Sequence, residues 1–290
     1  MTTFTKMEDF SVEESLTFPD GQPHVKLLNI NKTIPTVYCR LASTDDIVKL
    51  ILLRNVLSNQ GIAKVNLSIL YLMGARMDRA LSKDEPFTLQ AIADLINSLH
   101  FNQVQIFCPH SQKSLDLIMD SSSYRTRESI FFDTAIIKCL SKVPEFEKLL
   151  HENDTVANIR ESDKFSIVYP DKGACDRMAG TPFGSWYKNT GRVILDKNRE
   201  ERTGKILGMK IISGEVKETA IILDDLCDGG ATFKGAAECL RQAGAKNVFL
   251  AVCHGIFSRG LPIEGVDFVC TTNSFKDWES NENVYIHKVF

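Results

Sequence analysis

The chain has 290 residues, of which 43% are hydrophobic and 24% charged, with 17 glycines and 9 prolines. This composition is typical of a folded globular protein and excludes disordered, collagen-like and coiled-coil classes. Lys and Arg together number 34 against 37 Asp and Glu, and the net charge of −3 argues against a nucleic-acid-binding protein that acts through bulk positive charge. Any polyanion that the protein binds must be small and recognised locally.

The distribution of apolar residues and cysteines indicates a cytoplasmic protein. The longest apolar stretches, such as Val248–Cys253, are far shorter than the roughly 18 to 20 residues that cross a bilayer, so we expect no membrane partner. The N-terminal segment lacks a basic stretch followed by an apolar run, which argues against a secretory signal. The 8 cysteines are scattered and show no zinc spacing, which predicts reduced, mostly buried thiols.

The first half of the chain alternates between strands and helices. Apolar periodicity predicts, in chain order, the strand 36–41, the helix 45–57, the strand 65–73, the helix 87–99 and the strand 104–108. A less diagnostic helical stretch covers 129–150, and the polar segment that begins at His151 marks the expected domain boundary. The predicted domains are therefore 1–150 and 151–290.

The second half repeats this alternation. Short runs of strand type occupy 165–169, 193–196, 220–223, 248–253 and 268–271, and a helix over 233–243 ends before Gly244, which takes the position of a C-terminal cap. Strand, helix and strand at this spacing imply an α/β fold with parallel sheets, which bind ligands at the carboxyl ends of their strands. The residues that follow each strand are therefore the candidate site.

The sharpest local signal is the segment 220–232, in which an apolar strand leads into Asp224 and Asp225, then an Asp-Gly-Gly-Ala-Thr turn, then a helix. Glycines bring backbone N–H groups close to an anion, and the helix adds its positive N-terminal dipole, so we interpret the turn as a phosphate cradle. Paired carboxylates suit the vicinal hydroxyls of a ribose. An isolated turn with Asp228 or Thr232 as a helix cap is the simpler alternative. No P-loop or Gly-x-Gly-x-x-Gly motif competes for the phosphates.

Five segments together resemble one enzyme family. Leu223–Thr232 resembles the PRPP-binding signature shared by type I phosphoribosyltransferases and ribose-phosphate diphosphokinases. Four further segments resemble the diphosphokinases specifically and follow in the family's order, namely Phe18–Gln22, Tyr71–Arg79, Ile167–Arg177 and Ala251–Ser258. The resemblance implies two similar parallel-sheet domains of the type I phosphoribosyltransferase-like fold, with ATP bound by 1–150 and the ribose phosphate by 151–290.

The resemblance also implies roles for individual residues. ATP is expected at Phe18, Asp20, Gln22, Arg76, Met77 and His110, and the ribose phosphate at Asp224, Asp225, Asp228, Gly229, Gly230, Ala231 and Thr232. His110 and Asp171 are implied to associate with Mg²⁺, and Lys197 and Arg199 are the implied catalytic cations. In this family Phe18 and Asp20 usually reach into a neighbouring subunit, so we expect a homo-oligomer, either a dimer or a hexamer.

The implied reaction suits these residue types. The anomeric hydroxyl of ribose 5-phosphate attacks the β-phosphorus of ATP, a diphosphoryl group moves to give PRPP, and AMP departs. Such a transfer needs positioning and charge neutralisation, which Lys197 and Arg199 supply. Their segment, 197–205, is rich in charge, and we expect a mobile loop that closes over substrate. On charge alone it would be an ordinary solvated surface loop.

Several departures from the family pattern leave the acceptor open. Gly229 stands where members usually carry threonine, and Gln22, Met77, Pro109 and Lys172 are also unusual. The lost hydroxyl at 229 suggests an alternative acceptor, ADP-ribose, whose diphosphorylated product would serve NAD salvage. Trp186, Tyr187 or Lys172 would then contact the extra nucleotide, although the two aromatic residues would equally well cover the core.

Other interpretations stay open. A type I phosphoribosyltransferase would use the same acidic loop but would not release AMP from ATP, and a non-catalytic synthetase-associated subunit would lack the cations that this chain carries at 197 and 199. His110 and His254 are each of a residue type that often serves only as a hydrogen-bonded structural group. Cys227 lies in the acidic loop, but no partner base indicates a nucleophile.

Overall fold

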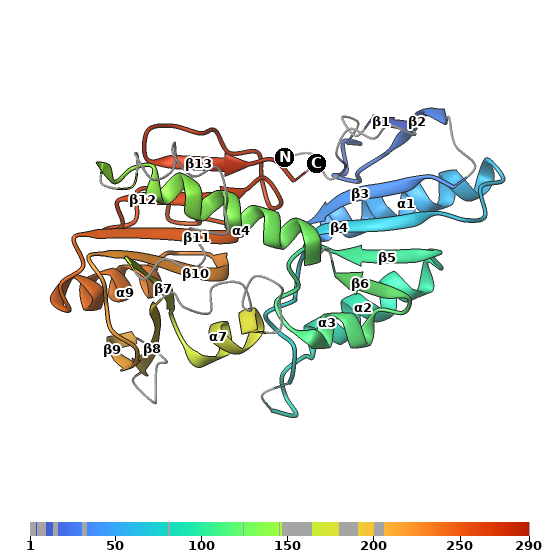
Figure 1. Ribbon diagram of the computed structural model, residues 1–290. Coiled ribbons are helices and arrows are strands. Elements are labelled where there is room, and N and C mark those ends of the chain that lie inside the picture. Colours follow the sequence, from blue (N-terminus) through green and yellow to red (C-terminus); the bar gives the residue numbers. More distant parts are fainter. Residues whose placement is uncertain are drawn as a thin grey trace. The chain divides into compact units, whose positions relative to one another are not determined.

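The computed structural model describes residues 4, 10–13, 17–30, 34–80, 82–123, 125–144, 146, 164–179, 191–199 and 206–289. The chain forms two compact units, Met1–Tyr124 and Arg125–Val289, here called the N-terminal and C-terminal units. Each has its own sheet and its own helices (Figure 1). Within the described ranges, none of the helices has the length and apolar character needed to cross a membrane.

The N-terminal unit contains a four-stranded parallel sheet with the strands in chain order. These strands are β3 (Thr36–Leu41), β4 (Asn66–Leu72), β5 (Gln103–Ile106) and β6 (Ser121–Ser123). The helices α1 (Thr44–Asn59), α2 (Thr88–Ser98) and α3 (Gln112–Leu117) follow the first three strands, and β1 (Phe10–Glu13) pairs antiparallel with β2 (Lys26–Ile30). The parallel sheet requires these crossover helices, because parallel neighbours cannot be joined by a tight turn.

Helix α1 shows how local sequence determines an element of this unit. Ser43 caps the helix: its hydroxyl accepts from the backbone N–H of Asp46, while Asp46 Oδ2 accepts from the backbone N–H of Ser43 at 2.7 Å. This reciprocal capping box satisfies helix-terminal donors that would otherwise lack partners. Leu50, Leu53 and Leu57 then bury against the sheet at helical spacing.

The C-terminal unit is built on a seven-stranded sheet in the order β13-β12-β11-β10-β7-β8-β9. Its strands are β7 (Phe165–Tyr169), β8 (Gly191–Arg199), β9 (Ile206–Ser213), β10 (Thr219–Cys227), β11 (Asn247–Gly255), β12 (Phe268–Thr272) and β13 (Val284–His287). The pairings are parallel except for β8 with β9. The helices are α4 (Arg125–Leu140), α7 (Lys172–Ala179) and α9 (Ala231–Gln242).

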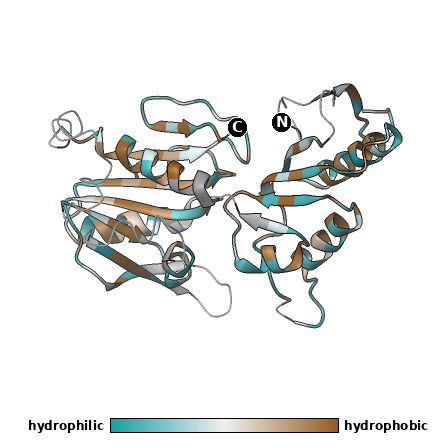
Figure 2. Ribbon diagram, turned by 45° about the vertical axis from the view of Figure 1, so that its right-hand side comes forward, coloured by the Kyte–Doolittle hydropathy of each residue, from teal (hydrophilic) through white to brown (hydrophobic). Residues whose placement is uncertain are grey.

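Helices α4 and α9 cover opposite faces of this sheet. Val269 of β12 belongs to the apolar cluster that contains α9, whereas Cys270 contacts the carbonyl oxygen of Ala135 in α4. Successive strand residues point to opposite faces, so the central strands are buried on both sides. Their ribbons are accordingly mainly brown in Figure 2. The Cys270 and Cys139 sulfurs lie 3.7 Å apart beneath α4.

The predicted elements agree with the structure in type, but many of their boundaries differ by several residues. The strands 36–41 and 165–169 match β3 and β7, and Gly244 follows α9 with φ +104°. The units divide at 124/125 and not near residue 150, because α4 packs on β11, β12 and β13. The segment expected as a mobile loop from Lys197 begins instead as the end of β8, paired with β9, while 200–205 lie outside the described residues.

The cysteine prediction is confirmed. All 8 cysteines are free, and six of them are buried. Cys175 and Cys239 are the two that are half-buried.

Candidate functional site

The acidic pair lies inside β10, not just after it, because this strand continues to Cys227. Asp224 and Asp225 are 7% and 4% exposed. The turn that follows leads through Gly230, whose φ of +77° is a left-handed conformation suited to glycine, into the N-terminus of α9. The buried carboxylates and a helix N-terminus therefore stand together at the carboxyl end of the sheet.

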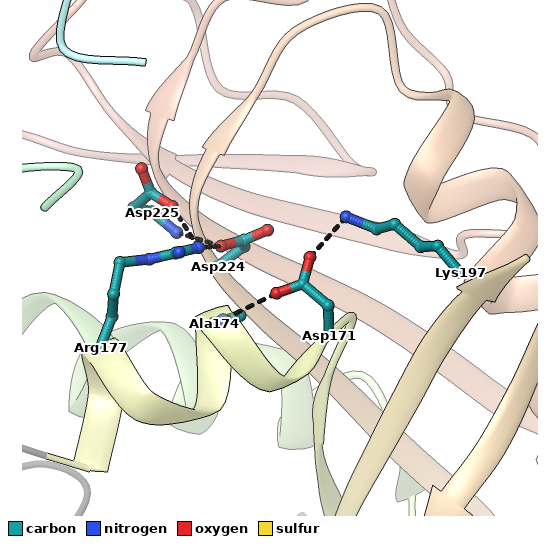
Figure 3. Close-up of polar contacts among 6 residues, drawn as sticks. All are labelled: Asp171, Ala174, Arg177, Lys197, Asp224 and Asp225. Carbon is teal, nitrogen blue, oxygen red and sulfur yellow. Dashed lines mark hydrogen bonds and ion pairs between the residues drawn. The ribbon is translucent and has the colours of Figure 1, made fainter. Parts of the chain in front are cut away.

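One guanidinium bridges both carboxylates. Arg177, in the second turn of α7, places Nη2 2.9 Å from Asp224 Oδ1 and 3.0 Å from Asp225 Oδ1 (Figure 3). Asp224 Oδ1 also accepts the backbone N–H of Asp225 at 2.9 Å. The predicted sugar-binding acids are thus held by a cation from a neighbouring element, a residue to which sequence analysis gave no role. Its position soon after the Pro-Asp turn of the family-like segment is the signal that could have identified it.

Burial and neighbouring charges shift the pKa values of Asp224 and Arg177. Burial, followed by the charge of Asp225, raises the pKa of Asp224 well above its usual value, against the opposing charge of Arg177. The pKa of Arg177 is itself raised, because the charges of Asp225 and Asp224 outweigh the effect of its burial. Two adjacent buried carboxyl groups beside one guanidinium make a site rich in hydrogen-bond acceptors, which suits hydroxyl donors.

A second ion pair lies at the ends of the neighbouring strands β7 and β8. Lys197 Nζ is 2.6 Å from Asp171 Oδ2, and Asp171 Oδ1 accepts the backbone N–H of Ala174 at 2.8 Å (Figure 3). Although burial raises the pKa of Asp171, the hydrogen bond from Lys197 and the other interactions outweigh it, so the pKa lies below its usual value. The predicted catalytic cation and the predicted metal-associated acid are therefore in direct contact.

Gly229 leaves room for an arginine that sequence analysis missed. A Cβ at this glycine would lie 3.4 Å from Arg259 Nε and 3.5 Å from Arg259 Cδ. Arg259 is exposed and forms no hydrogen bond or ion pair with any other residue that the structure describes. Its signal in the sequence is a basic residue in the loop after β11, next to the anion-binding turn.

Two further groups near the loop, Cys227 and His254, have environments that fit structural roles. Burial, together with the charges of Asp224 and Asp228, raises the pKa of the Cys227 thiol to about 12, so it stays protonated at neutral pH. His254 is buried, and its Nδ1 lies 2.9 Å from the Ser274 hydroxyl. The hydroxyl of Ser274 donates in turn to the Cys253 carbonyl oxygen at 3.1 Å, which fits a structural histidine.

The predicted ATP-binding residues near the N-terminus lie on an exposed turn. The Phe18 N–H donates to the Gln22 carbonyl at 2.9 Å, and the Gln22 N–H donates to Asp20 Oδ1 at 3.1 Å. Phe18 is 45% exposed and meets His24 edge-on. Their geometry is local, and their contact with ATP stays a prediction.

The other predicted ATP-binding residues follow two strands of the N-terminal sheet. Arg76 and Met77 are exposed in the turn after β4, where the Met77 N–H donates to the Gly74 carbonyl at 2.8 Å. His110 is half-buried between β5 and α3. These positions agree with the rule that ligands bind at the carboxyl ends of parallel strands, and their roles stay predictions.

Some predicted positions cannot be placed in the site. Trp186 and Tyr187 lie outside the described residues, and of Arg199 only the backbone is described, paired with Ile206 in β9. In the described part of the chain, no three His, Cys, Asp or Glu side chains come together as a metal-binding group. Mg²⁺ is nevertheless often held by one or two carboxylates plus substrate phosphates, so Asp171 alone is compatible with it.

Comparison with known proteins supports one family. No family model matches the chain. The ribose-phosphate pyrophosphokinase of Pyrococcus abyssi is 27% identical over 250 residues, which cover 84% of this chain and 76% of that protein. The enzyme of the same name from Mycoplasmopsis pulmonis is 26% identical over 285 residues, which cover 94% and 79%. Over most of its length the chain is similar to these ribose-phosphate pyrophosphokinases. It is therefore a transferase.

The fold agrees with this family. The crystal structure of phosphoribosylpyrophosphate synthetase from Mycobacterium smegmatis matches the chain with a TM-score of 0.70 at 16% identity, covering 97% of this chain and 86% of that one. The α/β fold with parallel sheets, expected from the sequence, is thereby confirmed. The matched region includes both units of the chain.

Proposed function

We propose that the protein transfers the diphosphoryl group of ATP to the anomeric hydroxyl of ribose 5-phosphate, giving PRPP for nucleotide biosynthesis and releasing AMP. The observation that carries the proposal is the acidic pair Asp224 and Asp225, buried and cation-held at the end of β10, directly before a glycine turn and the N-terminus of α9. The carboxylates suit the ring hydroxyls, and the turn and helix suit the 5-phosphate.

In this proposal Lys197 is the principal cation at the reacting phosphate. The new bond forms between the anomeric oxygen and the β-phosphorus, and the bond from that phosphorus to the α,β-bridging oxygen breaks with AMP as the leaving group. Charge accumulates on the oxygens around the phosphorus, where a fixed ammonium stabilises the transition state. The ion pair with Asp171 keeps the Lys197 ammonium at the end of β8 until it contacts phosphate. Arg199 would add a fork that binds paired oxygens.

The metal belongs to the same proposal. Asp171 and His110 are its assigned protein partners, together with nucleotide phosphates, and Mg²⁺ would supply charge neutralisation at the diphosphoryl group. Both Asp171 oxygens already accept hydrogen bonds, one from Lys197 and one from the Ala174 N–H. Asp171 can therefore turn to a metal most directly when Lys197 moves to the substrate.

The proposal assigns ATP binding to Phe18, Asp20, Gln22, Arg76, Met77 and His110. It also includes assembly of the protein into a homo-oligomer. The exposure of the Phe18 ring, 45%, supports a role that depends on a ligand or a neighbouring subunit, because an aromatic side chain gains most when it is covered.

A second candidate acceptor is ADP-ribose, which would make the enzyme one of NAD salvage. The specific observation in its favour is Arg259 beside Gly229. An acceptor whose 5-phosphate carries a second phosphate offers one more anion at this turn, and Arg259 is a guanidinium without an ion-pair partner in the described part of the chain. Gly229→Thr, which fills this space, should then disfavour ADP-ribose relative to ribose 5-phosphate.

Mass spectrometry of the products tests both candidates. The purified protein is incubated with ATP and Mg²⁺, and with ribose 5-phosphate or ADP-ribose in parallel. We expect AMP and an acceptor heavier by one diphosphoryl group. AMP with ADP-ribose alone assigns the second candidate. Absence of AMP with both acceptors contradicts the proposal, and consumption of PRPP with a nucleobase, without AMP release from ATP, would indicate a phosphoribosyltransferase.

A further inference from the structure

The contact between α7 and β10 carries an inference about how the sugar site is organised. Arg177 lies on α7, which follows β7, whereas the acids lie on β10, the strand beside β7 in the sheet. We propose that Arg177 is the positioning residue of the sugar site, holding Asp224 and Asp225 side by side so that the pair accepts hydrogen bonds from two neighbouring ring hydroxyls. This inference rests on the proposed function.

The geometry supports a positioning role. The guanidinium contacts each carboxylate through Oδ1 only, so the second oxygen of each is not engaged by Arg177. One nitrogen, Nη2, makes both contacts and thereby ties the two carboxylates to a common point. Two acceptors fixed relative to each other match two vicinal hydroxyls, because a rigid ring presents its donors at a fixed spacing.

Electrostatics make the cation necessary. Asp224 and Asp225 are adjacent in the chain and buried, and like charges this close oppose ionisation of both. Arg177 forms an ion pair with both acids, whereas Lys197 forms its ion pair with Asp171. The charge of Arg177 lowers the pKa of Asp224 against the effects of burial and of Asp225, so its loss should raise that pKa further.

The surroundings of Arg177 are consistent with this role. Gly173, one helical turn before it, would place a Cβ 3.3 Å from Arg177 Nη1 and 3.2 Å from Asp171 Oδ1. A glycine at this position therefore leaves room for the guanidinium between α7 and β10 and for Asp171 at the start of the helix. The Arg177 Nε is buried without a hydrogen-bond partner, so the guanidinium is held mainly by the two carboxylates.

A ligand cycle separates positioning from a merely structural role. Calorimetry measures the binding of ribose 5-phosphate and 2-deoxyribose 5-phosphate, and of ADP-ribose and its analogue deoxygenated at C2 of the distal ribose, to the wild type, Arg177→Gln and Arg177→Lys. We expect the wild type to prefer the ribose form about tenfold, or about 1.4 kcal/mol. Arg177→Gln should reduce this preference to less than about threefold, with Arg177→Lys between them.

Arg241→Gln is the matched control. Arg241 lies in α9 of the same unit and pairs with Asp267 at 2.7 Å, so the variant removes a similar ion pair away from the acidic loop. It should keep the wild-type preference for ribose. The proposal is overturned if Arg177→Gln loses affinity equally for the ribose and the deoxyribose ligands. If Arg177→Gln fails to fold, an unchanged preference for ribose in Arg177→Lys overturns it instead. Failure of both variants to fold makes the role structural and overturns it too.

The wild type distinguishes this inference from the proposed function. If it binds ribose ligands with a preference that depends on Arg177 but releases no AMP from ATP, the proposed function fails and the inference stands. If it turns over and the preference survives in folded Arg177 variants, only the inference fails. A wild type that binds none of the four ligands overturns the acceptor assignment and the inference together.

Discussion

The candidate sites of the two units differ in how far they are formed without a ligand. In the C-terminal unit, Asp224, Asp225 and Lys197 each have an ionic partner from another element. In the N-terminal unit, Phe18 and Met77 lie on turns and are 45% and 41% exposed. The difference suggests that the sugar site is preorganised, so that little ordering is left for binding, whereas residues assigned to ATP become ordered by their ligand.

Among the predicted effects, the largest is expected from loss of the Lys197 cation, which tests the preorganised site of the C-terminal unit. Lys197→Ala should lower the rate of AMP release about a hundredfold to a thousandfold, as removal of a transition-state donor does in other enzymes. The rate is measured with both substrates saturating. Lys210→Ala, on the paired strand β9 and facing Asp196 at 3.7 Å, is the control and should retain full activity. Undiminished AMP release in Lys197→Ala would remove this residue from the catalytic assignment.

Neutralising Asp224 tests whether this carboxylate strengthens acceptor binding while lowering the stability of the folded protein. Asp224→Asn should lower affinity for the acceptor about tenfold, since it removes a charged acceptor. It should also raise Tm at pH 7 by about 2 to 4 °C, because one buried like-charge interaction disappears. Differential scanning calorimetry measures the second effect. Asp267→Asn, at an exposed ion pair, should not raise Tm.

The stability gain of Asp224→Asn should depend on pH in a defined direction. The folded state raises the pKa of Asp224 above its unfolded value, so the stabilising contribution is full below the unfolded pKa and is lost as pH rises through the folded pKa. The advantage of the variant should therefore shrink as pH falls from 7 towards 4. An advantage that grows on acidification would show that Arg177 dominates the pair.

Truncation of Phe18 tests the exposed side, where the smallest effect is expected. Phe18→Ala should raise the KM for ATP a few-fold while leaving Tm within about 1 °C of the wild type, because an exposed ring contributes little to folding. Leu28→Ala, which truncates a similarly exposed side chain (49%) in the same unit, should change neither value. A marked fall in Tm for Phe18→Ala would mean that this turn is already packed without ligand.

Element types were predictable because apolar periodicity records them directly. The helix 87–99 carries apolar residues at helical spacing, and the strand 165–169 is a short run that is buried throughout. The extension of β8 to Arg199 was not predictable, since its charged residues form a strand only because β9 pairs with them. The helical stretch 129–150, which includes most of α4, was less diagnostic, and periodicity does not show which sheet a helix covers.

The candidate site was predictable in its residues but not in its contacts. The acids at 224 and 225 and the lysine at 197 were identified by motif. Arg177 and Arg259 had no assigned role, because each reaches its neighbour across a large separation in the chain. Lys197 was expected on a loop, and its contact with Asp171 depends on the sheet placing β7 beside β8.

The paired sulfurs under α4 make the opening of the C-terminal unit measurable by thiol alkylation. Cys139 and Cys270 are fully buried, one on the helix and one on β12, so an alkylating reagent reaches them only while the helix is lifted from the sheet. Cys175 and Cys239 are partly accessible in the closed state. We expect Cys175 and Cys239 to be labelled promptly and Cys139 and Cys270 slowly, so the delay of the second pair measures how often α4 separates from the sheet.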